Sequence, residues 1–146
     1  MNTAQKWVVF IEPLLKLRTL EPTRVGKLLA LRWRFEGTTP FQIRFRARGG
    51  IVPVEQAELR WTEKPEAGML ILSLPQERRL PHWFAADHFA PCREWISDSH
   101  GGSLEFVLSR DVPAGELRLA SGRVGSDCFV HTVVIENQAL HVPPSP

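Results

Sequence analysis

The chain has 146 residues, of which 43% are hydrophobic and 23% are charged, and both fractions are typical of a globular domain. These fractions exclude wholesale disorder, collagen and a coiled coil. Eighteen basic residues against sixteen acidic ones give a net charge of +2, too close to balance for a protein whose whole surface binds nucleic acid. We therefore expect one folded domain and no nucleic-acid partner.

The first predicted elements are two short strands. The apolar run at 7–11 ends after five residues at Glu12 and Pro13, which is too short for a signal peptide or a membrane span. We expect strands at 7–11 and 14–20 and no membrane-spanning segment. A cytoplasmic protein, or a domain excised from a longer one, is the simplest interpretation.

The clearest alternation of apolar and charged residues lies between positions 25 and 48. Apolar residues occupy 29, 31, 33 and 35, and after turn residues at 37–40 the same period of two resumes from 41 to 47. This pattern predicts an antiparallel hairpin with one face in the core and one in solvent. The arginines of the solvent face are Arg32, Arg34, Arg44, Arg46 and Arg48.

Further strands are predicted along the rest of the chain, about every 8 to 12 residues. They fall at 59–61, 69–74, 104–108, 117–119 and 129–135. The exception is 81–100, which lacks alternation and is expected to cap one end of the fold as a long loop with one or two helical turns. The predicted fold class is all-β: an antiparallel β-sandwich, jelly-roll or immunoglobulin-like, of eight or nine strands. It occupies residues 1–141, and 142–146 form an extended proline-rich tail.

The row of arginines has two interpretations. As a functional surface it would bind a phosphate, an acidic sugar or a partner's carboxylates, because the guanidinium group offers paired donors to such anions. As a structural surface it would form a ladder of solvated ion pairs with Glu36, Glu55 and Glu58 of the same sheet.

The segment 82–100 holds the other candidate residues. Trp83, Phe84, Phe89 and Trp95 could form a platform for a sugar ring, with His88 beside it, or could pack over the end of the sandwich. Three histidines, one cysteine and two aspartates within this segment could bind zinc by composition. Their spacing lacks the close ligand pairs of such sites, so we predict no metal and no cofactor.

Nucleophilic catalysis has little support in the sequence. Cys92 follows His88, and Ser97 or Ser99 lies near an aspartate and a histidine, but no Gly-x-Ser-x-Gly motif occurs. His131 lies between apolar neighbours and is interpreted as a core histidine. The two cysteines, Cys92 and Cys128, are expected to be free thiols, although a single bridge between them stays open.

Two segments carry a family resemblance. Residues 41–49 and 127–137 resemble the early and closing strands of jelly-roll carbohydrate-binding modules, and 103–137 is similar to β-rich accessory regions beside bacterial glycosyltransferases. The resemblance implies a non-catalytic module that binds a glycan or glycoconjugate, or an accessory domain of a carbohydrate-handling enzyme. The chain departs from these modules in having no tyrosine.

The predicted ligand is a glycan or another anionic ligand. Its contacts would be Trp83, His88 and Trp95, with the arginine row as an anionic subsite.

Two alternative functions remain open. One is an assembly or adaptor protein, whose sheet face and edge strands bind another subunit or a second copy of the chain. The other is a small metal-dependent or Cys/His-dependent enzyme built on 82–100.

Overall fold

A computed structural model describes residues 3–38, 43–48, 54–63, 66–76, 79–98 and 104–137. The elements are α1 (Thr3–Leu15), α2 (Pro22–Leu29), β1 (Arg34–Thr38), β2 (Ile43–Arg48), β3 (Gln56–Glu63), β4 (Glu66–Ser73), β5 (Leu80–Pro81), α3 (His82–His88), β6 (Arg93–Asp98), β7 (Leu104–Val112), β8 (Gly115–Val124) and β9 (Asp127–Glu136). The predicted tail at 142–146 lies outside the described residues. Among the described helices, none has the length and apolar character needed to cross a membrane.

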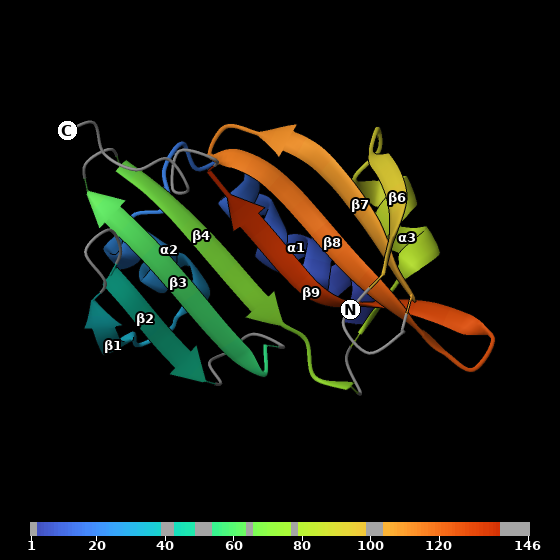
Figure 1. The fold of residues 1–146 in the computed structure, drawn as a ribbon, viewed down its shortest axis with the longest axis horizontal. Coiled ribbons are helices and arrows are strands. Elements are labelled where there is room, and N and C mark those ends of the chain that lie inside the picture. The colour runs from blue at the N-terminus through green and yellow to red at the C-terminus, as the bar shows by residue number, and fades with distance from the viewer. Residues whose placement is uncertain are drawn as a thin grey trace.

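The strands form one antiparallel sheet in the order β1-β2-β3-β4-β9-β8-β7-β6, and the short β5 pairs with β9 (Figure 1). Two meanders, β1–β4 and β6–β9, therefore join where β4 pairs with β9. The predicted all-β antiparallel class with eight or nine strands is confirmed. In the order of the described strands, β1 and β6 are the two edges of the sheet.

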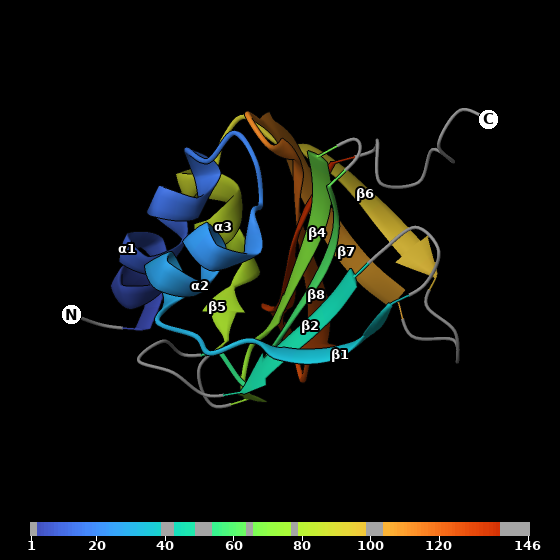
Figure 2. The ribbon, with the colours of Figure 1, turned by 90° about the vertical axis from the view of Figure 1, so that its left-hand side faces the viewer.

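All three helices lie on one side of the sheet (Figure 2). We call this side the helix-covered face and the other side the open face. Along each strand the side chains alternate between the two faces. Buried residues such as Leu59 and Leu70 point to the helix-covered face, whereas their neighbours Glu58 and Ile71 point to the open face.

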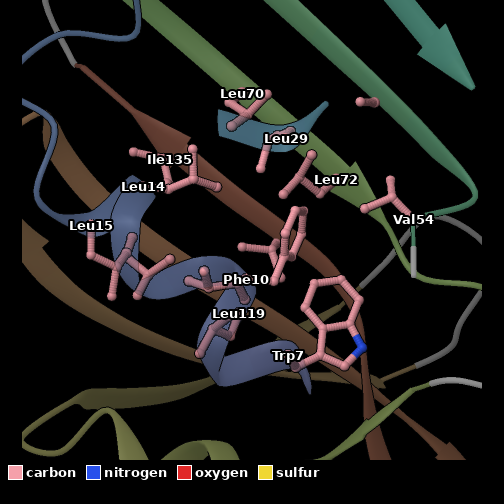
Figure 3. Close-up of a cluster of buried hydrophobic side chains, with 14 of the residues drawn as sticks. Trp7, Phe10, Leu14, Leu15, Leu29, Val54, Leu70, Leu72, Leu119 and Ile135 are labelled. Carbon is pink, nitrogen blue, oxygen red and sulfur yellow. The ribbon is translucent and has the colours of Figure 1, made fainter. Parts of the chain in front are cut away.

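The core lies between the helices and this covered face (Figure 3). In α1 the buried residues Trp7, Ile11 and Leu14 recur at the spacing of one helical face. Full burial of each such side chain stabilises the fold by about 1.5–3 kcal/mol. The sheet contributes Leu59, Leu70, Leu72, Leu119, Val133 and Ile135.

The strands predicted at 7–11 and 14–20 are wrong, because this segment forms α1 and the loop that follows it. Five consecutive apolar residues fit either period, so the run at 7–11 cannot distinguish a strand from a helix.

The predicted strand from 25 is also wrong over its first half, which forms α2. Glu21 begins this helix: its carboxylate accepts hydrogen bonds from the amides of Thr23 (3.0 Å) and Arg24 (3.1 Å). Pro22 stands at the first helical position, where its missing N–H has no cost. These contacts lower the pKa of Glu21, the amide of Thr23 being the main cause.

The segment 81–100 is partly as predicted. Its helical turns are confirmed by α3, but 93–98 form an edge strand, β6, where we expected loop. The strand escapes detection because it exposes apolar side chains on both faces, with Trp95 on one and Ile96 on the other. Apolar and polar residues therefore do not alternate along it.

Candidate functional site

Two members of the arginine row, Arg34 and Arg46, are compensated by glutamates. Arg46 lies opposite Arg34 and places its guanidinium 3.4 Å from Glu36 and 3.6 Å from Glu58. Arg34 lies 3.6 Å from Glu36. Arg60 on β3, outside the predicted row, lies 3.4 Å from Glu58. Arg34 and Arg46 thus form part of the predicted ladder of ion pairs.

Three members of the predicted row remain. Arg32 is exposed in the segment before β1. Arg44 and Arg48 belong to β2, but their side chains lie outside the described residues.

His88 is occupied by an internal contact. Its Nε2 lies 3.0 Å from a carboxylate oxygen of Glu12, and its ring stacks on Phe84 and meets Phe89 edge-on. The side chain therefore joins α3 to α1. The residue predicted as a ligand contact, His88, therefore already has Glu12, Phe84 and Phe89 as partners.

The predicted aromatic pair is split between two places. Trp83 is 71% exposed on α3, which packs on the helix-covered face. Trp95 is 41% exposed on β6. It pairs with Val107, which pairs with Ala120, and this row of residues points to the open face. The structure therefore does not bring Trp83, His88, Trp95 and the arginine row into one site.

A hydrogen-bonded chain of three polar residues links α3 to the second meander. His82 Nδ1 lies 2.8 Å from the hydroxyl of Ser121 on β8, and His82 Nε2 lies 2.9 Å from Glu94 on β6. With its proton on Nε2, His82 donates to Glu94 and accepts from Ser121. The sequence analysis missed this chain because its members come from three separate elements.

This hydrogen-bonded group has the residue types of a serine-hydrolase triad, but the solvent exposure of its serine and carboxylate does not suit catalysis. Ser121 is completely buried, and Glu94, at the other end, is exposed. A nucleophilic serine must reach a substrate, and here the carboxylate alone faces solvent. The chain is better suited to fixing α3 on the sheet and satisfying the buried hydroxyl.

A second polar group lies on the open face of the second meander. A register shift beside Ser121 leaves His131 as an extra residue of β9, between the buried Val130 and the half-buried Thr132. His131 Nδ1 lies 2.8 Å from the hydroxyl of Thr132, and Nε2 lies 3.3 Å from Glu105 on β7. The bulge thus removes His131 from the core position that its apolar neighbours predicted.

Gly122 provides the space for this contact. A Cβ at Gly122 would lie 3.4 Å from the His131 ring, so the ring crosses β8 where that strand carries no side chain. Burial lowers the pKa of His131; Glu105 opposes this shift, and Arg79 adds to it.

The exposed indole of Trp95 lies on the same face as this polar group. Thr132 pairs with Ala120 in the row that ends at Trp95. Glu105 is diagonal to Trp95 across β6 and β7, a placement that corresponds to about 7–8 Å. We call Trp95, Glu105, His131 and Thr132 the Trp95 site.

In the described part of the chain, no side chains are assembled for metal binding or for thiol chemistry. There, no three His, Cys, Asp or Glu side chains are placed to hold a metal ion. Cys92 and Cys128 are free thiols, as expected, and burial raises the pKa of both. A raised pKa reduces the reactive thiolate at neutral pH.

No protein-family model matches this sequence, and comparisons with curated proteins and with solved structures give no significant match. The resemblance to carbohydrate-binding modules therefore stays a prediction.

Proposed function

We propose that this chain is a non-catalytic binding module and that it binds a neutral sugar on the open face, at the Trp95 site. The observation that carries the proposal is the exposed indole of Trp95 beside the hydrogen-bonded group of Glu105, His131 and Thr132. A flat indole packs against the C–H face of a sugar ring, and carboxylate and imidazole groups bind its hydroxyls.

Charge favours a neutral ligand over an acidic one. The Trp95 site contains the carboxylate of Glu105, which repels anions and accepts hydrogen bonds from hydroxyl groups. The arginine that we expected to supply an anionic subsite, Arg46, contacts two glutamates. We accordingly replace the predicted anionic ligand with a neutral one and remove Trp83 and His88 from the contact set.

The test is a titration of intrinsic tryptophan fluorescence with cellohexaose, xylohexaose and maltohexaose, and with hexagalacturonate as the acidic comparison. We expect at least one neutral oligosaccharide to bind, and Trp95→Ala to raise its Kd at least tenfold, about 1.4 kcal/mol. Trp83→Ala is the matched control, since it removes a more exposed indole on another element, and its Kd should equal that of the wild type.

Three results would contradict the proposal. These are the absence of binding to any of the four sugars, a loss of binding in Trp83→Ala but not in Trp95→Ala, and a preference for hexagalacturonate that Arg46→Gln removes. Circular dichroism of each variant verifies that the fold is retained. A cytoplasmic location and a role beside a carbohydrate-handling enzyme stay predictions.

A further inference from the structure

The edge strand β6 exposes two consecutive large apolar side chains on opposite faces of the sheet. Trp95 points to the open face, and Ile96, 60% exposed, points to the helix-covered face beyond the helices. Leu104 on the neighbouring β7 is 53% exposed. Edge strands of natural proteins are normally shortened, bulged or charged, because their free backbone groups pair with other chains. β6 carries charged residues at its ends, but its centre is formed by the exposed apolar residues Trp95 and Ile96.

Two of the charged residues of β6, Arg93 and Glu94, already have partners within the chain. Arg93 lies 3.0 Å from Asp111 and 3.3 Å from Glu116, and Glu94 is bound by His82. A strand that pairs with β6 therefore needs no acidic residue opposite Arg93, whose charge is already paired. It needs backbone groups and apolar side chains on both faces, and β6 of a second copy supplies both.

The opposite edge of the sheet is protected. β1 has five residues, and its pairing with β2 is interrupted by a register shift between Phe35 and Gly37. Its charged residues Arg34 and Glu36 point to the open face, where they join the ion-pair ladder. The two edges thus differ in the features that prevent strand pairing.

We propose that two copies of this chain pair antiparallel through β6, with the two-fold axis at Trp95. A two-fold axis perpendicular to the sheet keeps the open face on one side in both copies. Opposed residues must then share a face, so both are odd-numbered or both are even-numbered. Centring the pair on Trp95 opposes Arg93 with Ser97 and Glu94 with Ile96, and no like charges meet. Centring it on Ile96 would oppose Glu94 with Asp98, two acidic residues.

This pairing would also enlarge the sugar site. The two indoles would lie opposite each other on the open face, about 4.5–5.5 Å apart at Cβ, and form one aromatic surface. The dimer itself does not depend on sugar binding, so the two proposals fail separately.

The test is the mass of the protein in solution, measured by light scattering after size exclusion from 1 to 200 μM, the range in which we expect dimer to form. Ile96→Glu places a carboxylate opposite Glu94 of the second copy, on the face opposite to Trp95, and should weaken dimerisation at least tenfold. Phe35→Glu on β1 and Val9→Glu on α1 are matched controls, because each residue is also 60% exposed, and both should remain dimeric.

Cysteine cross-linking tests the register. In a chain carrying Cys92→Ser and Cys128→Ser, Trp95→Cys should form an intermolecular disulfide on oxidation, and Ile96→Cys should not, because the Cα atoms of diagonal residues are too far apart. A monomer at 200 μM, a dimer that persists in Ile96→Glu, or preferential cross-linking at position 96 would overturn the proposal. If Ile96→Glu is monomeric and still binds a short neutral oligosaccharide, the dimer and the sugar site are separate properties.

Discussion

The two meanders of the sheet share one architecture and differ in what they present to solvent. On the open face of the first meander, β1–β4, Arg46 lies between Glu36 and Glu58, and the meander ends in a bulged edge. On the open face of the second meander, β6–β9, a histidine bulge lies near an exposed tryptophan, and the meander ends in an apolar edge. In the meander with the conspicuous charges, the guanidinium groups of Arg34, Arg46 and Arg60 are thus already paired with carboxylates of the same meander.

The difference shows that the number of charges on a strand does not predict a binding surface. Four arginines fall within β1 and β2, but glutamates on the neighbouring positions and strands neutralise those that are described. Exposed ion pairs of this kind contribute about 0–1 kcal/mol each. Apolar side chains that stay exposed after folding are the stronger indication of a binding surface.

The largest expected difference between the meanders concerns their glycines. At Gly115, where φ is +144°, a Cβ would lie 2.1 Å from the carbonyl oxygen of Glu136. Gly115→Ala should therefore cost about 3 kcal/mol or more of the free energy of unfolding, or prevent folding.

At Gly37, in the bulge of β1, φ is +158°, but a Cβ would meet no described atom within 4 Å. Gly37→Ala should therefore cost backbone strain without a clash, about 1–3 kcal/mol, which is less than Gly115→Ala. Urea denaturation of the two variants measures the difference. Equal losses would mean that the second meander is no more tightly built than the first.

A smaller effect on stability is expected when the hydrogen bonds of His82 with Ser121 and Glu94, which fix the β6 edge, are removed. His82→Ala leaves the buried hydroxyl of Ser121 without its partner and releases Glu94, at a cost of about 1–3 kcal/mol. Replacing Ser121 by Ala in the same chain removes the unpaired hydroxyl. The double variant should then be less destabilised than the sum of the single variants, by about 0.5–3 kcal/mol.

Hydrogen exchange locates this effect. Amide exchange in His82→Ala should become faster in β6 and stay unchanged in β1, because His82 contacts only the second meander among the described strands. Additive losses, or exchange that accelerates equally in both edges, would show that His82 does not hold β6.

The sequence predicted the strands whose two faces differ in polarity. β3 and β8 bury alternate residues on one face against the helices, so a period of two is visible in them. The sequence failed where burial does not follow that period. α1 was predicted as strands because its apolar run is continuous. Phe35 was placed in the core by alternation, but it is 60% exposed on the edge strand β1.

The candidate site was predictable in part. Trp95 could be nominated as a large aromatic residue near the end of the predicted loop. Glu105 and His131 could not, since their place on the same face as Trp95 depends on the pairing of β6, β7, β8 and β9 and on one bulge. Contacts between side chains from distant strands depend on register, and a shift of one residue moves a side chain to the other face.

The smallest expected effect is a pH dependence confined to the second meander. No histidine occurs between residues 34 and 73, whereas His131 of β9 has a pKa lowered mainly by burial. In the unfolded chain a histidine titrates near pH 6.5. As the pH falls from about 6.5 towards the lower folded pKa, the unfolded chain therefore binds a proton that the folded chain does not, and stability decreases. Above pH 7.5 this contribution is constant and at its full value.

Urea midpoints measured from pH 7.5 to 5 for the wild type and for His131→Gln isolate this contribution, because the other titrating groups are common to both chains. The wild type should lose more stability than His131→Gln as the pH falls. Glu105 acts in the opposite direction, since its carboxylate favours the charged imidazole. If the wild type instead gains stability relative to His131→Gln on acidification, the attraction of Glu105 exceeds the cost of burial, and the open face of the second meander holds a charged histidine.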